Sequence, residues 1–377
     1  MSVARALAVV DLGAVERNCA CLADAAGDAE LCAVVKADGY GHGAVECARA
    51  ALAGGATRLA VAAAGEAAEL RAELADVPIL VMGALTPDEL EVALDAAAEL
   101  TVWRSGFLDL VRERARGRGE RPRVHVKYDT GMGRLGERDP EAVTELVASA
   151  EGSEEVEPAG LWTHFATADE SDSGFFEEQL ERFLELALPL RERHPGLALH
   201  AANSAATLRE PAAHLDMVRC GVAVYGLDPF GAEPGRHGLE PALELRSYIA
   251  DSKRFEPGTS AGYGRTWRAG EPTVVGVLPI GYGDGVRRGL SNNAEVLAAG
   301  RRYPLIGTVS MDNLTIDLGP DPAARPGDAA VLIGSQGGER ILCEELAQRL
   351  GTINYEITCG ISPRVPRDYV RSAGPRS

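Results

Sequence analysis

Short β-branched runs alternate with Ala/Glu/Leu-rich stretches through residues 31–219, and this alternation constrains the fold more than any other feature of the sequence. Eight such runs predict strands at 31–36, 58–62, 78–82, 99–102, 123–128, 158–162, 197–201 and 215–219. Helices are predicted between them, for example over 64–75, 87–98 and 173–193. Strands that alternate with helices form a parallel sheet, because parallel strands need a long crossover. Eight strand–helix units in about 200 residues favour a small (β/α)8 barrel of TIM type over an open doubly wound sheet.

After about residue 230 the pattern changes to short strand-like runs separated by Gly/Pro turns. Strands are predicted at 242–250, 272–279, 294–298, 302–306, 312–318 and 329–334. The only good helical stretch there is 343–350. This pattern predicts a second, mostly antiparallel β domain, with the turn-rich stretch Gly226–Pro241 as the linker.

Charge and cysteine usage narrow the class of protein. The chain has 38 basic and 56 acidic residues and a net charge of −18, which argues against a nucleic-acid or membrane partner, because both need a positive face. The apolar runs at 58–64 and 78–82 are far short of the ~20 residues of a membrane helix, and the N-terminus has no signal-peptide layout. Seven scattered cysteines, none at zinc spacing, are interpreted as reduced thiols, so we expect a cytoplasmic protein without a metal site.

Reactive side chains collect where the predicted barrel strands end. In such a barrel the active site lies at the C-terminal ends of the strands. Those ends carry Lys36, Lys127 with Arg134 just beyond, His164, Asn203 with Ser204, and Arg219 with Gly221. The joint pattern predicts a site that binds anions and uses an amine.

Lys36 closes a buried apolar run. Burial lowers the pKa of a lysine, so the amine can act as a nucleophile that forms a Schiff base. Two other interpretations stay open: a strand-end lysine that reaches the surface, and a dinucleotide fingerprint in Gly39-x-Gly41-x-x-Ala44. The fingerprint lacks an acid at the end of the next strand, because Glu66 lies inside the following helix.

The other strand-end residues also have two interpretations each. Arg134, in the glycine-rich loop 129–136, suits a carboxylate or is a solvated surface side chain. His164 is either a site residue or a satisfied core histidine. Asn203 and Ser204 begin a predicted helix and either cap it or bind phosphate.

In the second domain, tyrosines flanked by glycines are predicted to lie on loops where a hydroxyl is presented to a partner. The segments concerned are 262–266, 281–285, 311–313 and 354–356. Taken one at a time, each loop is better explained by a structural role than by a catalytic one.

Taken together, these motifs resemble those of a known family. AVVKADGYGHG, VKYDTGMGRLG, THFATAD, NSAAT, RCGVAVYG, GYGRT, IGYGDG, VSMD and NYEITCGISPRVPR follow one another between about residues 30 and 370. They resemble the successive signatures of the alanine racemases, pyridoxal 5'-phosphate (PLP) enzymes of fold type III. The resemblance implies a PLP-binding barrel over 12–233 and a β domain made of 234–377 together with 1–11, whose short first strand near 5–11 joins it.

The resemblance also implies roles for individual residues. Lys36 would hold PLP covalently, and Arg219 would face its pyridine nitrogen. The other residues expected at the cofactor, mainly around its phosphate and phenolic oxygen, are Tyr40, Arg134, His164, Asn203, Ser204, Gly221, Val222 and Tyr355. The substrate would meet Arg134, the backbone N–H of Met311, Asp312 and the gate residue Tyr282. Lys127 would be carbamylated and orient Arg134.

The implied reaction is a two-base interconversion of L- and D-alanine. Lys36 would serve the D side and Tyr263 the L side, with His164 and Arg219 in the hydrogen-bond network of the tyrosine. Tyr263 would come from the other subunit of a homodimer, so each active site would be composite. The product would be D-alanine for peptidoglycan.

Three alternatives remain within reach of the sequence. A serine or broad-specificity racemase is hard to distinguish by sequence, because one extra hydroxyl on the substrate changes its affinity for a small pocket only modestly. A fold-III decarboxylase would use a Cys-Glu type loop where this chain has Gly262-Tyr263-Gly264, and a PLP carrier protein would end near residue 230. Among departures from the family pattern, Cys220 beside Arg219 places a thiol near the cofactor, and we interpret it as a small core residue.

Overall fold

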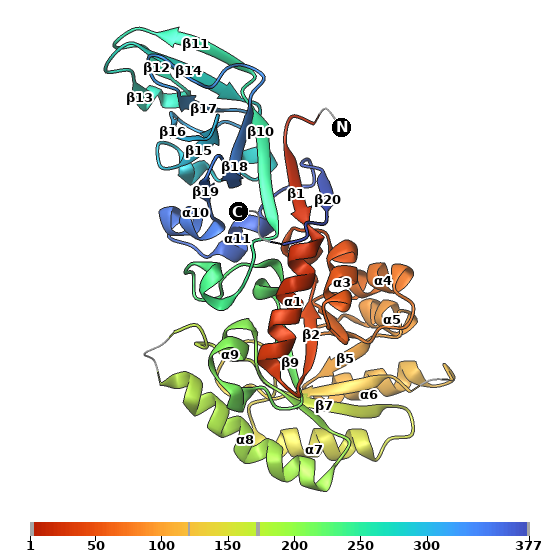
Figure 1. The fold of residues 1–377 in the computed structure, drawn as a ribbon. Helices are drawn as coiled ribbons and strands as arrows, with labels where there is room; N and C mark the ends of the chain where they lie inside the picture. The colour runs from red at the N-terminus through yellow and green to blue at the C-terminus, as the bar shows by residue number, and fades with distance from the viewer. Residues whose placement is uncertain (1–3, 120, 171–173, 375–377) are drawn as a thin grey trace. The chain divides into compact units, whose positions relative to one another are not determined.

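The computed structural model describes residues 4–119, 121–170 and 174–374. The described residues form two compact units (Figure 1). The barrel unit comprises Val15–Gly39 and Ala44–Val224. The β unit comprises Tyr40–Gly43 and the described parts of Met1–Ala14 and Tyr225–Ser377.

The barrel unit contains the eight predicted parallel strands. They are β2 Glu30–Val34, β3 Arg58–Val61, β4 Ile79–Val81, β5 Glu99–Val102, β6 Arg123–Lys127, β7 Glu157–Trp162, β8 Ala198–His200 and β9 Met217–Cys220. The sheet runs β8-β7-β6-β5-β4-β3-β2-β9, so β9 returns beside the first strand. Only the seam between β8 and β9 lacks strand pairing. Two backbone bonds cross it, from Asp216 N to Leu199 O (3.0 Å) and from Arg219 N to Ala202 O (2.9 Å). The predicted barrel is confirmed, nearly closed.

Helix α1 precedes β2, and further helices follow most of these strands. Their bounds are α1 Leu12–Ala26, α2 Lys36–Tyr40, α3 Ala44–Ala53, α4 Ala64–Glu73, α5 Pro87–Asp95, α6 Ser105–Ala115, α7 Pro140–Glu151, α8 Phe175–Arg193 and α9 Ser204–Arg209. Local sequence explains where several begin: Thr86 and Glu89 form a capping box at α5, and Pro87 takes its first turn. The helices predicted over 64–75 and 87–98 are confirmed as α4 and α5. The one predicted over 173–193 is α8, and residue 173 lies outside the described residues.

The β unit is built on one large, mostly antiparallel sheet. Its strands are β1 Leu7–Asp11, β10 Leu243–Tyr248, β11 Asp251–Phe255, β12 Ser260–Ala261, β13 Trp267–Arg268, β14 Thr273–Leu278, β15 Glu295–Ala298, β16 Arg301–Ile306, β17 Leu314–Asp317, β18 Ala329–Gln336, β19 Glu339–Ile341 and β20 Arg367–Val370. The order is β11-β14-β17-β16-β15-β18-β10-β1-β20, with β19 on β18, while β12 and β13 pair separately. The N-terminal strand β1 lies antiparallel to β10 and parallel to β20, so the expectation that the first strand joins this sheet is confirmed. Helix α10 (Cys343–Leu350) has the predicted bounds, whereas α11 (Asn354–Cys359) was not predicted.

The stretch predicted as a linker is packed rather than free. Asp228 is fully buried, and its carboxylate accepts hydrogen bonds from Phe230 N (2.7 Å) and pairs with His237 Nδ1 (2.8 Å). Its backbone carbonyl accepts from Asn354 Nδ2 at 2.8 Å. The turn residues therefore serve a buried polar network.

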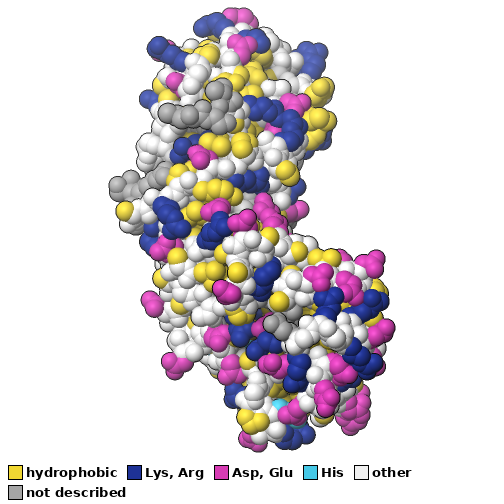
Figure 2. Space-filling view, turned by 90° about the vertical axis from the view of Figure 1, so that its right-hand side faces the viewer, with side chains coloured by type: hydrophobic (Ala, Val, Ile, Leu, Met, Phe, Trp, Pro, Cys, Tyr) yellow, Lys and Arg dark blue, Asp and Glu magenta, His cyan; other side chains and the backbone are white. Residues whose placement is uncertain are grey.

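Three further observations bear on the class of protein. Among the described residues, no helix is long and apolar enough to cross a membrane. All seven cysteines lie in described segments and are free thiols, as expected. Acidic and basic side chains are interspersed on the face shown in Figure 2.

Candidate functional site

Lys36 stands where β2 turns into an unusual backbone segment. Ala37, Asp38, Gly39 and Tyr40 all have left-handed φ angles, between 53° and 59°. For residues other than glycine this costs about 1–2 kcal/mol each, so neighbouring contacts must hold the turn. Ala37 N donates to Glu66 Oε1 (2.6 Å), and Asp38 Oδ1 accepts from Ala44 N (3.0 Å). Glu66 therefore supports the lysine turn, which argues against the dinucleotide interpretation of this segment.

Lys127, at the end of β6, is only 2% exposed. Its Nζ lies 4.1 Å from the ring centroid of Trp162. Burial, followed by the positive charges of Arg134 and Arg219, lowers the pKa of Lys127 to about 7. Its amine is therefore substantially neutral at physiological pH.

Four basic side chains lie close enough together at the strand ends of the barrel unit to affect the pKa of His164: Lys36, Lys127, Arg134 and Arg219. We refer to them as the cationic cluster. His164 lies among them, and burial, then these charges, keep its pKa well below the usual value, so its imidazole is neutral. A cluster of this kind in a chain of net charge −18 is suited to an anionic ligand.

The loop that carries Arg134 is shaped by glycines, as predicted. Gly131, Gly133 and Gly136 all have positive φ angles. The Asp129 carboxylate closes the loop by accepting from Gly131 N and Gly133 N, both at 3.0 Å. Arg134 itself is exposed and has no hydrogen-bond or ion-pair partner within the described chain. The loop thus presents an unengaged guanidinium.

Ser204 and Asn203 lie at the start of α9. The Asn203 side chain accepts from Ala206 N at 3.0 Å, so its helix-cap role is confirmed. The Ser204 hydroxyl accepts from Gly221 N (3.0 Å), just after β9. The hydroxyl and the backbone that enters the 3₁₀ helix Val222–Tyr225 therefore form one small polar corner.

Arg219 is 3% exposed and lies with its guanidinium carbon 4.6 Å from the Trp162 ring centroid. It donates from Nη1 to His200 Nδ1 (2.9 Å), and from Nη2 to Thr163 O (2.8 Å) and Ala201 O (3.0 Å). Burial lowers the pKa of Arg219 to about 10, so it stays charged at neutral pH. Two of its five N–H groups, on Nε and Nη1, have no acceptor among the described residues.

Cys220, next in β9, is fully buried. Its Sγ lies 3.4 Å from Thr207 Oγ1, and burial raises the pKa of the thiol to about 12. The thiol is therefore unreactive, in agreement with its interpretation as a small core residue.

Within the β unit, Tyr40 and Tyr355 belong to an aromatic group. Their ring centroids are 6.0 Å apart, and Tyr40 lies 5.2 Å from Tyr225. The buried His42 stacks on Tyr225 at 4.5 Å. The sequence predicted the two tyrosines Tyr40 and Tyr355. It missed His42 and Tyr225, although both stand inside motifs already singled out.

Among the described residues of the β unit, Tyr263 is the most exposed large hydrophobic side chain, at 73%. It begins the 3₁₀ helix Tyr263–Arg265 between Gly262 and Gly264, both at positive φ. A Cβ on Gly262 would come within 2.9 Å of Thr308 N, and the Thr308 hydroxyl donates to Tyr263 O at 2.8 Å. The backbone is held closely while the phenol extends outward.

Tyr282 and Met311 lie on two loops that are hydrogen-bonded to each other. Tyr282 N donates to Ser310 O (3.0 Å) and Gly283 N to Met311 O (2.9 Å). Both side chains are exposed, at 43% and 52%. The structure therefore brings together two residues that the sequence places far apart.

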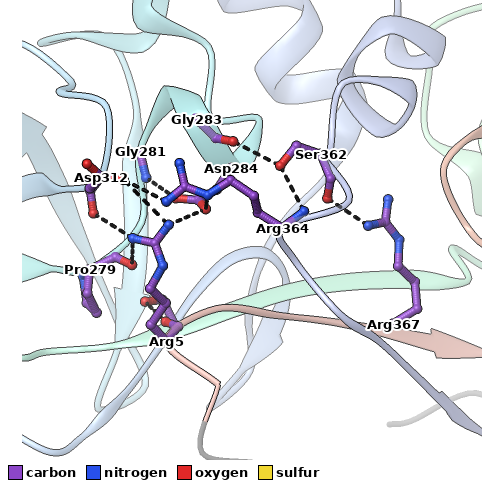
Figure 3. A network of polar contacts seen from close by, with 10 residues as sticks. Arg5, Pro279, Gly281, Gly283, Asp284, Asp312, Ser362, Arg364 and Arg367 are labelled. Carbon is purple, nitrogen blue, oxygen red and sulfur yellow. Dashed lines mark hydrogen bonds and ion pairs between the residues drawn. The ribbon is translucent and has the colours of Figure 1, made fainter.

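A network of charges holds these two loops (Figure 3). Arg5 donates to the buried Asp284 at 2.6 Å and to Asp312 O at 3.3 Å. Arg364 donates to Asp312 Oδ1 at 2.7 Å, and Gly281 N to Asp284 Oδ2 at 2.9 Å. Asp312 thus serves in positioning its own loop.

Replacing Arg5 with methionine should lower the free energy of unfolding by about 1–2 kcal/mol, because the buried Asp284 loses a charged donor. Chemical denaturation measures the change. Arg254→Met is the matched control, since Arg254 is 61% exposed and 3.4 Å from Glu256. That control should shift stability by less than about 0.5 kcal/mol. Equal effects in the two variants would contradict a special role for the network.

Residues inside the barrel were missed entirely. His200, His125 and Glu99 connect to Arg219 through the lumen, but the sequence shows them only as single polar residues within apolar strand runs. Trp162, which contacts both Lys127 and Arg219, was likewise not singled out.

Comparison with known proteins agrees with this arrangement. Residues 10–229 match the family model "Alanine racemase, N-terminal domain", and residues 242–369 match "Alanine racemase, C-terminal domain". A curated alanine racemase of Desulforamulus reducens is 43% identical over 345 residues, which is 90% of this chain and 92% of that protein. The solved alanine racemase of Streptomyces coelicolor A3(2) is 39% identical with a TM-score of 0.93, covering 98% of this chain and 99% of that one.

A further solved relative, the Bacillus anthracis alanine racemase with bound L-Ala-P, is 37% identical with a TM-score of 0.90. It covers 99% of this chain and 97% of that one. These matches span both units, their order along the chain and nearly every predicted motif. The chain therefore belongs to the alanine racemase family.

Proposed function

We propose that this protein interconverts L- and D-alanine with PLP as its cofactor. The observation that carries the proposal is the position of Lys36, two residues after β2 and within the cationic cluster at the strand ends of a parallel barrel. Family membership supports the same activity.

The residues present fit PLP. A phosphate is suited to the corner of the barrel unit formed by the Ser204 hydroxyl and the backbone of Gly221 and Val222. From family membership we also assign to the phosphate the hydroxyls of Tyr40 and Tyr355, whose rings lie together in the β unit. The unengaged N–H groups of Arg219 suit an aromatic nitrogen acceptor. The buried Trp162 Nε1 also has no hydrogen-bond partner among the described residues. His164 and Asn203 complete the surroundings that we assign to the cofactor. Bound PLP supplies an electron sink that makes the α-proton of an amino acid acidic.

We assign the two proton transfers to Lys36 and to Tyr263. Lys36 Nζ would hold the cofactor and, as a free amine, would move the α-proton on the D side. The Tyr263 hydroxyl handles it on the L side, with the neutral His164 and Arg219 in its hydrogen-bond network. Two groups on opposite faces are what inversion at one carbon requires.

Arg134, Met311, Asp312 and Tyr282 serve the substrate in this proposal. The exposed guanidinium of Arg134 is suited to a carboxylate, and the Met311 backbone N–H is a second donor. Tyr282 and Tyr355 narrow the entry, which favours a small amino acid.

We further propose a homodimer in which Tyr263 acts on the barrel of the partner subunit. The support is the exposure of Tyr263, Tyr282 and Met311, three large side chains gathered on loops of the β unit. D-alanine made in the cytoplasm would then supply peptidoglycan synthesis, as family membership suggests.

Proton NMR in D₂O tests the function. We expect loss of the α-proton signal of alanine, with inversion seen by chiral analysis, when PLP and either enantiomer are supplied. Exchange on serine but not on alanine would indicate that serine is the substrate. Loss of carbon dioxide from a basic amino acid would indicate a decarboxylase. No exchange on any amino acid would refute the proposal.

Lys127 is proposed to be carbamylated, because a buried amine with a pKa near 7 is neutral enough to attack carbon dioxide. With ¹³C-bicarbonate, a carbamate signal should be strong above pH 7 and should fall below it, as protonation removes the nucleophilic amine. Carbon-13 NMR measures the signal. Lys127→Met should abolish it, while Lys253→Met, at an exposed lysine, should not. A signal that survives Lys127→Met would contradict the assignment.

A further inference from the structure

A chain of hydrogen bonds crosses the barrel lumen behind Arg219. Arg219 Nη1 lies 2.9 Å from His200 Nδ1, His200 Nε2 lies 3.0 Å from His125 Nδ1, and His125 Nε2 lies 2.8 Å from Glu99 Oε2. Glu99 is the first residue of β5, whereas His200 is the last residue of β8. The chain therefore runs from the strand-end face that carries the site to the opposite end of the barrel.

The two ends of the chain fix its direction. An arginine can only donate, so His200 Nδ1 must accept and its hydrogen must be on Nε2. His125 Nδ1 then accepts from His200, and its own hydrogen must be on Nε2, facing Glu99. An ionised carboxylate can only accept, which completes the sequence without a conflict. A second proton on either histidine would place two donors face to face.

The barrel is built to hold this chain. All four side chains are nearly inaccessible, from 0% for His200 to 7% for Glu99. The register of β6 against β7 shifts between Val124 and His125. A Cβ on Gly160 of β7 would lie only 2.4 Å from His125 Nδ1, so a glycine there leaves room for the ring.

Glu99 is held ionised by its own neighbours. It pairs with Arg58 at 2.8 Å and with Arg123 at 3.0 Å. Burial alone would raise its pKa, but the interaction with His125 and the positive charges of Arg58 and Arg123 outweigh burial and lower the pKa. Glu30 and Glu157 bind the outer sides of Arg58 and Arg123. These five residues, each the first of its strand, form a line of alternating charges that we call the charged rim.

We propose that Glu99, His125 and His200 are positioning residues for Arg219. By fixing which hydrogen each ring carries, they hold the guanidinium so that only its Nε and remaining Nη1 hydrogens are free. The inference rests on the proposed role of Arg219 as the donor to the cofactor ring nitrogen. It assigns the orientation of that donor to Glu99, which lies at the opposite end of the barrel.

The first test needs no cofactor. In ¹⁵N-labelled protein, both histidines should be neutral with hydrogen on Nε2, and a scalar coupling should cross the hydrogen bond from His200 Nε2 to His125 Nδ1. His125→Gln and His200→Gln assign the signals. A hydrogen on Nδ1 of either ring, or a doubly protonated ring, would overturn the proposal whatever the protein catalyses.

The second test uses Glu99→Gln, because a neutral amide can donate or accept and no longer enforces one direction. We expect the coupling to weaken and the absorption band of bound cofactor to shift. A less well held Arg219 would no longer keep the cofactor's ring nitrogen unprotonated, and the stronger electron sink would favour transamination as a side reaction. The ratio of racemisation to transamination should therefore fall, by about the 10- to 100-fold that loss of an outer hydrogen-bond partner typically costs. The KM for alanine should change little, since Glu99 touches no substrate.

Glu157→Gln is the matched control. It removes a carboxylate from Arg123, which also pairs with Glu99, but Glu157 takes no part in the hydrogen bonds between Glu99, His125, His200 and Arg219. It should leave the coupling, the absorption band and the reaction ratio unchanged, and Glu99→Asp should restore part of what Glu99→Gln loses. If Glu99→Gln changes none of these readouts, or Glu157→Gln changes them equally, the proposal is overturned. A protein that has the coupling but binds no PLP would instead refute the proposed function.

Discussion

Lys36→Ala should lower racemisation by at least about 10⁴-fold, because the variant loses both its covalent hold on the cofactor and one of its two proton-transfer groups. No other side chain can replace it. The chain contains only three lysines, and Lys253 lies on β11 in the β unit while Lys127 is buried against Trp162. The variant should keep its fold, since Lys36 follows a strand rather than packing within it.

The scarcity of lysines makes the covalent test simple. Borohydride reduction of the protein with PLP should fix the cofactor on one peptide, and mass spectrometry has only three candidate lysines to distinguish. We expect the label on Lys36 in the unmodified protein and in Lys253→Ala, and no label in Lys36→Ala. A label on Lys127, or full activity in Lys36→Ala, would refute the assignment.

Tyr263→Phe should produce an asymmetric defect rather than a uniform one. Without the hydroxyl, removal of the α-proton from L-alanine should slow by about 10²- to 10⁴-fold, the usual contribution of a general acid or base. Exchange that starts from D-alanine should persist, because Lys36 still serves that face. Cofactor binding should not change, since Tyr263 is 73% exposed on a loop of the β unit.

Deuterium incorporation measured separately from each enantiomer gives the result. Tyr248→Phe is a suitable control, because Tyr248 is also an exposed tyrosine of the β unit but lies within strand β10. The Tyr248→Phe variant should incorporate deuterium into both enantiomers at the rate of the unmodified protein. Equal loss from L- and D-alanine in Tyr263→Phe would contradict the division of labour between the two bases.

Much of this architecture could be predicted from the sequence because its signals are local. Parallel barrel strands are buried on both faces, so β3, β4 and β5 read as short apolar runs between helical stretches. Site residues such as Lys36, Lys127 and Arg219 were found because strand ends are visible in sequence. The β unit was harder. Strand β11 (DSKRF, residues 251–255) is mostly exposed and polar, and β20 pairs with a strand at the other end of the chain.

The lumen could not be predicted in the same way. His125 and His200 each look like one polar residue in an apolar strand, and nothing local says that their rings meet. Their contact depends on barrel closure, on the register shift at His125 and on the space left by Gly160. The left-handed turn after Lys36 was equally hidden, because it includes Ala37 and Asp38, which have no strong preference for that backbone.

The incomplete seam between β8 and β9 has a consequence for how the barrel opens. The charged rim ties together strands β2, β3, β5, β6 and β7 but reaches neither side of the seam. Two backbone bonds cross it, and the rest of the connection is made by side chains, such as the Arg219 bond to His200 and the Ser204 bond to Gly221 N. With no strand ladder at the seam, we expect local opening to begin there. Ser204 follows one side and Gly221 the other, so an anion held by both would strengthen the existing connection. Cofactor binding and completion of the barrel would then be a single thermodynamic event, with each favouring the other.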